Sequence, residues 1–296
     1  MIKRTLFISN PYHLSLKNKQ LQISERGGMV VGAASVEDLG FLVLDHPQIS
    51  FTMKLVEELS EFNVATVFCD SKHMPTSMLL SLDAHYIQSE LFRAQVAASE
   101  PLKKNLWKQT IEAKIRNQAR LLDKLNKKSL QLKTIAKTIK SGDSDNREGF
   151  AARIYWSALL GTEFVRDRYG EPPNNFLNYG YILLRSAVAR ALAGSGLLAT
   201  LGIHHRNRYN AFCLADDIME PYRPYVDEIA VDLNEKYPGT FGLEKEHKAE
   251  LLQLMATDVK IGENKRPLML ALSQTTASLA RCFAGEQRKI SYPVFE

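Results

Sequence analysis

The chain has 296 residues, 45% of them hydrophobic and 24% charged, with a formal net charge of +5. This length is enough for two ordinary domains, and this composition excludes a chain that is disordered as a whole. The most apolar stretch, residues 187–203, is interrupted by Arg190. The part that remains is shorter than the roughly 20 residues of a membrane span, so we expect none.

Neither a secretory signal nor a disulfide framework is expected. Residues 1–19 alternate apolar and polar side chains and lack the continuous apolar stretch of a signal peptide. The three cysteines, Cys69, Cys213 and Cys282, are widely spaced, which indicates free thiols in a reducing compartment. We therefore expect a soluble intracellular protein.

Residues 1–80 are predicted to form a small β-rich N-terminal domain with one helix. Short apolar or alternating runs bounded by turn residues predict strands. These runs are residues 5–8, 12–16, 21–24, 41–44 and 64–68. Residues 51–62 instead have apolar side chains at helical spacing, with Ser50 as the expected N-cap.

Residues 81–296 are predicted to form a larger, all-α domain, which makes the fold class α+β multidomain. After Pro75 the strand signals almost vanish, and we place the junction near residues 75–90. The helical period predicts helices in several stretches of this half. They are residues 106–139, 148–160, 178–192 and 244–255, with a polar loop at 141–146.

Residues 101–140, here called the basic segment, hold all of the excess positive charge. They contain twelve Lys or Arg and two acidic residues, whereas the rest of the chain is net negative. Solubility favours interspersed charges of both signs, so a segment of nearly one sign indicates a polyanion, most commonly nucleic acid. A lysine-rich, solvated helix face is the structural alternative.

A second feature is a region that is rich in histidine and carboxylate groups: His204, His205, Asp216, Asp217 and Glu220. If the acids are on a helix, 216 and 220 share a face, and their repulsion needs an arginine or a divalent cation nearby. Imidazole with two or three carboxylates is a ligand set for Mn²⁺ or Mg²⁺. The alternative is a capping histidine and a solvated helix start.

Glu148 follows the loop at 141–146 and begins a predicted helix. The negative charge of a glutamate at this position interacts favourably with the helix dipole, which is sufficient reason for its presence. It joins the histidine and carboxylate region only if the fold brings it beside His205.

Several motifs together resemble the CRISPR-associated integrase family, Cas1, the catalytic subunit of the spacer-acquisition complex. They are Glu148-Gly149, Asn178-Tyr179-Gly180-Tyr181, Gly202-Ile203-His204-His205 and the block from Asp217 to Pro224. The order of a β-rich domain followed by a helical one also matches the family. The residues of these motifs are most similar to those of the family members from type II systems.

The resemblance implies a metal-dependent DNA endonuclease and integrase. Such an enzyme inserts short foreign duplexes, the spacers, into a CRISPR array by attack of a 3′-hydroxyl on a phosphodiester. The family's catalytic metal ligands correspond to Glu148, His205 and Glu220, which would hold Mg²⁺ or Mn²⁺, with Asp217 as a possible outer-shell residue. The expected DNA-binding residues are Lys103, Lys104, Lys108, Lys114, Arg116, Arg120, Arg206, Arg208 and Arg223.

The resemblance also implies partners and a location. We expect double-stranded DNA as the substrate and a homodimer, with the N-terminal domain taking part in dimerisation. A small companion subunit, Cas2, would join two such dimers into a heterohexamer, and the type II effector nuclease is a further possible partner. The expected location is the cytoplasm of a prokaryotic cell.

Two other interpretations remain open at this point. A His-Asp-type metal phosphohydrolase also uses histidine and aspartate doublets on helices, although the adjacent His-Asp pair of that class is absent here. A non-catalytic DNA-binding scaffold would use the same acids and histidine as a buried polar network. Divalent-metal-dependent joining of DNA would indicate an integrase and exclude both of these alternatives.

Overall fold

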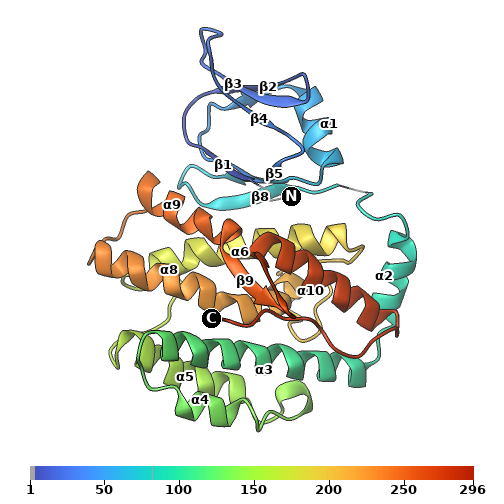
Figure 1. Cartoon of the computed structure of the whole chain (residues 1–296), viewed down its shortest axis with the longest axis vertical. Coiled ribbons are helices and arrows are strands. Elements are labelled where there is room, and N and C mark those ends of the chain that lie inside the picture. The colour runs from blue at the N-terminus through green and yellow to red at the C-terminus, as the bar shows by residue number, and fades with distance from the viewer. Residues whose placement is uncertain (1–3, 82) are drawn as a thin grey trace. The chain divides into compact units, whose positions relative to one another are not determined.

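The computed structural model describes residues 4–81 and 83–296, which divide into two compact units between Ala84 and His85. The boundary expected from the sequence, after residue 80, lies a few residues earlier. Figure 1 labels the elements of both units.

The first unit contains two four-stranded sheets and one helix, α1 (Met53–Glu61). One sheet has the order β1-β5-β7-β8, in which β8 is antiparallel to β7 and the other pairs are parallel. The other sheet has the order β4-β3-β2-β6. The strands are β1 (Arg4–Ile8), β2 (His13–Lys17), β3 (Gln20–Ser24), β4 (Val30–Ser35), β5 (Leu39–Leu44), β6 (Ser50–Phe51), β7 (Ala65–Cys69) and β8 (Pro75–Leu79).

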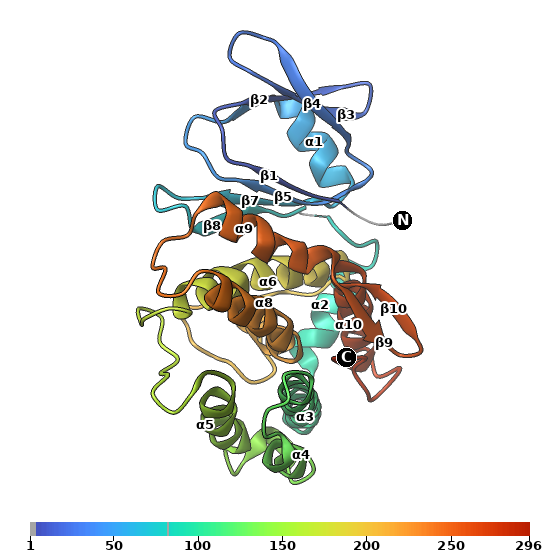
Figure 2. The same cartoon turned by 60° about the vertical axis from the view of Figure 1, so that its left-hand side comes forward.

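A single hydrophobic core joins both sheets to α1. It includes Leu14 of β2, Leu42 of β5 and Leu55 of α1, which are all almost completely buried. All six residues of β5 are buried, and the strand lies inside its sheet, between β1 and β7. Figure 2 shows α1 beside the two sheets.

The predicted N-cap of α1 is wrong. Ser50 belongs to β6, where it pairs with β2, and the cap is Thr52, whose hydroxyl accepts a hydrogen bond from the Leu55 N–H at 3.4 Å. The period of the apolar residues located the helix but not its first residue, because a short strand pairing precedes it.

The second unit is largely helical, so the predicted order of a β-rich region and a helical region is confirmed. Its helices are α2 (Gln88–Ala97), α3 (Glu100–Lys124), α4 (Leu130–Ile135), α5 (Arg147–Leu160), α6 (Asn174–Gly194), α7 (Cys213–Met219), α8 (Arg223–Lys236), α9 (Lys245–Leu252) and α10 (Leu268–Phe283). One detail differs from the all-α prediction: β9 (Asp258–Ile261) and β10 (Asn264–Pro267) form an antiparallel hairpin. In the described part of the chain, no helix combines the length and the apolar character of a membrane span.

The predicted helix at 106–139 is two helices. α3 ends at Lys124, because Asn126 has a positive φ of 55°, a conformation that asparagine tolerates better than most residues. α4 begins at Leu130. In Figures 1 and 2, α3 lies with α4 and α5 on one side and α8 and α10 on the other. The helix α3 makes up most of the basic segment, and it packs against α5, which holds Glu148, and against the 3₁₀ turn that holds Glu220.

Candidate functional site

Asp217 organises the loop that precedes α7. It is completely buried, and its carboxylate accepts hydrogen bonds from the backbone N–H groups of Ile203 (2.7 Å), His204 (2.9 Å) and His205 (3.2 Å). A side chain on Gly202 would not fit beside it, since a Cβ there would lie 2.4 Å from the His205 carbonyl oxygen and 2.7 Å from Asp217 Oδ2. The loop thus presents His205 in one fixed orientation.

The imidazole of His205 is oriented by the same carboxylate. His205 Nδ1 lies 2.5 Å from Asp217 Oδ1, and a carboxylate can only accept, so Nδ1 carries the proton. The hydrogen bond to Asp217 raises the pKa of His205, with further contributions from the charges of Glu220 and Glu148, although burial opposes them. In the neutral ring, Nε2 keeps its lone pair, which is the form of histidine that binds a metal.

Glu148 and Glu220 lie 72 positions apart and converge on one ammonium. Lys114 Nζ lies 2.6 Å from Glu148 Oε1 and 2.6 Å from Glu220 Oε2. The two carboxylate oxygens can therefore be no farther apart than twice that distance. Lys114 is buried on α3, and Glu220 is only 2% exposed in the 3₁₀ turn Glu220–Tyr222.

The start of α5 fixes Glu148. Asp143 accepts hydrogen bonds from the backbone N–H groups of Arg147 (2.9 Å) and Glu148 (3.0 Å), and the side chain of Asn146 caps the helix by accepting from Gly149 N–H (3.2 Å). These bonds satisfy N–H groups that the helix itself leaves free. The glutamate side chain is left to reach Lys114.

Two cations compensate the buried charge of Glu220. Arg223 Nη2 lies 2.8 Å from Glu220 Oε1, and its guanidinium lies 4.7 Å above the ring of Tyr181. Burial would raise the pKa of Glu220, but Arg223 and Lys114 outweigh it and lower the pKa. Burial would likewise lower the pKa of Lys114, but Glu220 and Glu148 outweigh it and raise the pKa. Glu220, Lys114 and Arg223 are therefore all ionised at neutral pH.

Glu220 Oε2 already has a cation as its neighbour. This oxygen is buried, and among the described residues Lys114 Nζ lies 2.6 Å from it. With Glu148 and His205 Nε2, it gives two carboxylates and one imidazole, a donor set that suits Mg²⁺ or Mn²⁺. The residues present therefore fit the metal that the sequence resemblance implies.

The structure brings two of the three predicted ligands together and leaves the third apart. Among the described residues, no three His, Cys, Asp or Glu side chains are arranged to hold a metal ion. The carboxylates of Glu148 and Glu220 meet at Lys114, while His205 Nδ1 is bound to Asp217. Asp217 directs both of its oxygens at the loop and at His205, so it has the geometry of an outer-shell residue.

Asp216 has a different role from its neighbour. Arg185 binds it at two points, with Nε 2.6 Å from Oδ1 and Nη2 2.9 Å from Oδ2, and Asn210 adds a hydrogen bond of 2.7 Å. The repulsion expected among the acids is thus relieved by arginine and lysine side chains.

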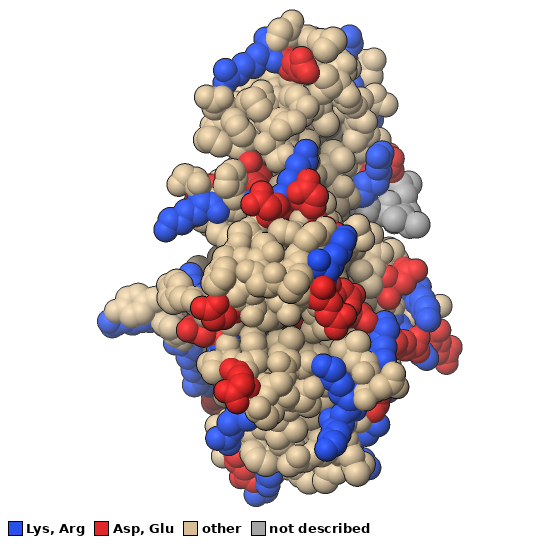
Figure 3. All heavy atoms as spheres, turned by 90° about the vertical axis from the view of Figure 1, so that its left-hand side faces the viewer, with Lys and Arg blue, Asp and Glu red and all other residues tan. Residues whose placement is uncertain are grey.

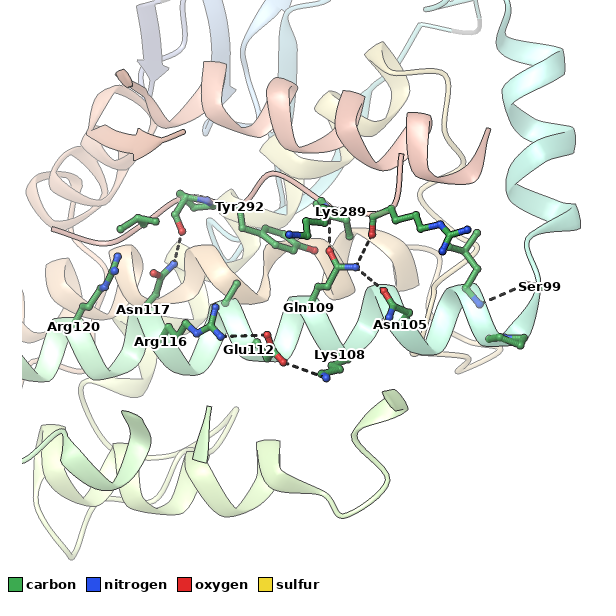
Figure 4. Close-up of a pocket in the computed structure, with 17 residues that line it drawn as sticks. Ser99, Asn105, Lys108, Gln109, Glu112, Arg116, Asn117, Arg120, Lys289 and Tyr292 are labelled. Carbon is green, nitrogen blue, oxygen red and sulfur yellow. Dashed lines mark hydrogen bonds and ion pairs between the residues drawn. The ribbon is translucent and has the colours of Figure 1, made fainter. Parts of the chain in front are cut away.

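A basic groove lies between α3 and residues 288–294, a stretch that we call the C-terminal segment. Its volume is about 1010 Å³, and Figure 4 shows polar side chains of α3 directed at this segment. Gln109 fixes the segment, because it donates to the Arg288 carbonyl (2.8 Å) and accepts from Ile290 N–H (3.0 Å). The cations that line the groove are Lys108, Arg116, Arg120, Arg288 and Lys289.

Most of the positive charge of this groove is uncompensated. Glu112 is its one acidic lining residue and pairs with Lys108 at 3.6 Å and with Arg116 at 3.3 Å. Within the described residues, Arg120 and the two cations of the C-terminal segment form no ion pair. On the face shown in Figure 3, Lys and Arg side chains are interspersed with Asp and Glu.

The remaining predicted DNA-binding residues divide into three groups. Lys103, Arg206 and Arg208 line a second cavity of about 480 Å³ together with His205, and Arg206 pairs with Glu100 at 2.6 Å. Lys104 is exposed on α3. Lys114 and Arg223 instead point inward and pair with the two glutamates.

Sequence reasoning missed two features of the site. Lys114 was counted with the basic segment, although it occupies the same face of α3 as the buried residues Trp107, Ile111 and Gln118. A lysine at an apolar position of a helix is a signal for a buried ion pair. Arg288 and Lys289 carry no signal, because only the folded chain brings them to α3.

Comparisons with known proteins agree on one family. The model for "CRISPR associated protein Cas1" matches residues 6–240. The CRISPR-associated endonuclease Cas1 of Neisseria meningitidis is 33% identical over 94% of this chain and 91% of its own. Among solved structures, a casposase bound to integration product has a TM-score of 0.81 at 19% identity, covering 100% of this chain and 95% of that one. A Cas6-RT-Cas1–Cas2 complex has a TM-score of 0.71 at 18% identity, covering 98% and 36%.

Proposed function

This chain belongs to the Cas1 family, since the family model spans most of its length and a relative at 33% identity spans 94% of it, and on that premise we propose that it is a divalent-metal-dependent DNA endonuclease and integrase. Its reaction joins the 3′-hydroxyl of a short duplex to a phosphodiester at a CRISPR repeat. Family membership favours this activity over that of a His-Asp-type phosphohydrolase.

One observation carries the proposal: Glu148 and Glu220 share the cation of Lys114, and the charges of both help to raise the pKa of His205, whose imidazole Asp217 orients. We propose that Glu148, Glu220 and His205 Nε2 hold Mg²⁺ or Mn²⁺. When bound, such a cation lowers the pKa of the attacking hydroxyl and neutralises the charge that develops on the phosphate. Arg223 remains on the other oxygen of Glu220 and keeps that carboxylate ionised and in position.

The substrate backbone is proposed to follow two sets of cations. Lys103, Arg206 and Arg208 line the cavity beside His205 and would orient the phosphates that react. Lys108, Arg116 and Arg120 line the basic groove and would hold the backbone without reading its sequence. Exposed Lys104 is part of the same proposal, whereas buried Lys114 is not.

Partners are proposed from the titles of the structural neighbours. One neighbour is a Cas6-RT-Cas1–Cas2 complex and another is a casposase bound to integration product. We propose a homodimer of this chain, with the N-terminal unit taking part, that assembles with Cas2 on double-stranded DNA. A contribution of the type II effector nuclease remains a prediction.

The deciding experiment mixes the protein and its Cas2 partner with a short fluorescent duplex and a supercoiled plasmid that carries a CRISPR repeat. Mn²⁺- or Mg²⁺-dependent appearance of the label in the plasmid supports the proposal. DNA binding without joining in any divalent ion would indicate a non-catalytic scaffold instead.

A further inference from the structure

Lys114 occupies the point where the two proposed carboxylate ligands meet. Its side chain emerges from the buried face of α3, and its ammonium touches one oxygen of Glu148 and one of Glu220, each at 2.6 Å. A buried lysine is expensive unless it is paired, and two carboxylates this close repel each other without a cation between them. The ammonium of Lys114 and the two carboxylates therefore stabilise one another in their buried, charged forms.

We propose that Lys114 is an internal counter-ion that competes with the divalent cation for Glu148 and Glu220 and so sets the metal affinity of the site. This inference rests on the proposed function, because it concerns the same two carboxylates. Lys114 is a positioning residue in this account: it keeps the glutamates together before the metal binds and has to release them when it does.

Competition follows from the atoms that the ammonium uses. It contacts Glu148 Oε1 and Glu220 Oε2, and the second of these oxygens is buried. A divalent ion that used the same lone pairs would lie close to the ammonium, and like charges at such a distance repel strongly in a buried site. The lysine has a flexible four-carbon stem and makes point contacts, which suits it to leave.

Arg223 lowers the free-energy cost for Glu220 of losing Lys114 as a partner. Its Nη2 binds the other oxygen, Oε1, at 2.8 Å, so Glu220 keeps one cationic partner when Lys114 moves away. The competition also accounts for the arrangement of the ligands. Lys114 draws the two carboxylates to itself, while His205 is held by Asp217 and completes no three-residue cluster with them among the described residues.

The test is the affinity of the full-length protein for Mn²⁺, measured without DNA by isothermal titration calorimetry and by electron paramagnetic resonance of the free ion. Lys114→Met keeps the apolar stem and removes the charge. We expect it to bind Mn²⁺ at least tenfold more tightly than the wild type. Lys128→Met is the matched control, because Lys128 is exposed in the turn after α3, and its affinity should equal that of the wild type.

Thermal unfolding gives a second readout. Without metal, Lys114→Met should unfold at a lower temperature than the wild type, because two buried carboxylates lose their shared cation. Saturating Mn²⁺ should raise its midpoint by more than it raises that of the wild type. If Lys114→Met does not fold, Lys114→Gln, which keeps a hydrogen-bond donor without the charge, takes its place.

The outcomes separate the inference from the proposed function. If Glu148→Gln abolishes Mn²⁺ binding but Lys114→Met binds no more tightly than the wild type, the site stands and the competition is refuted. If neither the wild type nor Lys114→Met binds Mn²⁺ through these carboxylates, both the site and the competition are refuted.

Discussion

Asp217 Oδ1 lies 2.5 Å from His205 Nδ1, and the same carboxylate receives the backbone N–H groups of residues 203–205. Both oxygens are committed to these donors. Asp217 therefore fixes the tautomer and direction of the imidazole and does not itself face the carboxylates at Lys114. This relationship separates a positioning residue from the proposed ligands.

The first prediction concerns this positioning role. Asp217→Asn replaces one acceptor oxygen by an amide that cannot accept from the loop or from His205. We expect Mn²⁺ affinity to fall by about 10- to 100-fold, the usual effect of losing an outer-shell partner. The control is Asp216→Asn, which disturbs the pair with Arg185 instead and should leave Mn²⁺ affinity unchanged. An equal fall in both variants would indicate general destabilisation and contradict the positioning role.

The second prediction concerns the proposed ligands. Glu148→Ala, His205→Ala and Glu220→Ala should each reduce strand joining below detection, because each removes a donor for the cation that activates the hydroxyl. Treatment of the wild type with a chelator should have the same effect, and added Mn²⁺ should restore the activity of the wild type alone. The measurement is transfer of the labelled duplex into the plasmid, with circular dichroism to check folding. A variant that is folded and active would remove its residue from the site.

The third prediction concerns the basic groove. Arg120 and Arg288 come from α3 and from the C-terminal segment, and no carboxylate among the described residues pairs with either. Replacing both by alanine should weaken duplex binding and lower the slope of log affinity against log salt by about 0.9 per lost phosphate contact. Fluorescence anisotropy at several salt concentrations measures both. The control variant replaces the exposed Lys128 and Lys137, which removes the same amount of charge outside the groove. If the salt slope of the control falls by as much as that of the Arg120 and Arg288 variant, the groove has no special role in DNA binding.

The fourth prediction concerns pH and a buried carboxyl on α8. Asp227 accepts hydrogen bonds from the hydroxyls of Tyr155 and Tyr181 at 2.6 and 2.5 Å. Burial raises the pKa of Asp227 from 3.8 to about 6, although both hydroxyls and Arg223 oppose the shift. The folded protein thus holds this proton more tightly than the unfolded chain. Its contribution to stability is complete below pH 3.8 and is lost as the pH rises through about 6.

The difference between the two pKa values corresponds to roughly 3 kcal/mol of unfolding free energy. Asp227→Asn has no proton to lose, so the stability of the wild type relative to this variant should decrease by an amount of that order between pH 4 and 7. Urea unfolding at a series of pH values measures the difference. Parallel pH profiles for the two proteins would contradict a raised pKa.

Local patterns in the sequence were sufficient where burial depends on neighbouring residues along the chain. The apolar period predicted α5, and the strand signals of the first unit predicted β5 and β7. They missed β4, β6, β8 and the β9–β10 hairpin, because edge pairings depend on partners elsewhere in the chain. The break between α3 and α4 was missed as well, since the apolar spacing continues across Asn126.

The sequence by itself determined the family, the order of a β-rich and a helical region, and the identity of the candidate ligands, because these are carried by residue types at fixed spacings. Only the tertiary structure decided which charges meet. Lys114 looked like one more cation of a DNA-binding helix, yet the fold buries it between two acids that lie far apart in the chain. The reason is that the free energy of a charge depends on its solvation and its partners, and neither can be read from the position of a residue in the sequence.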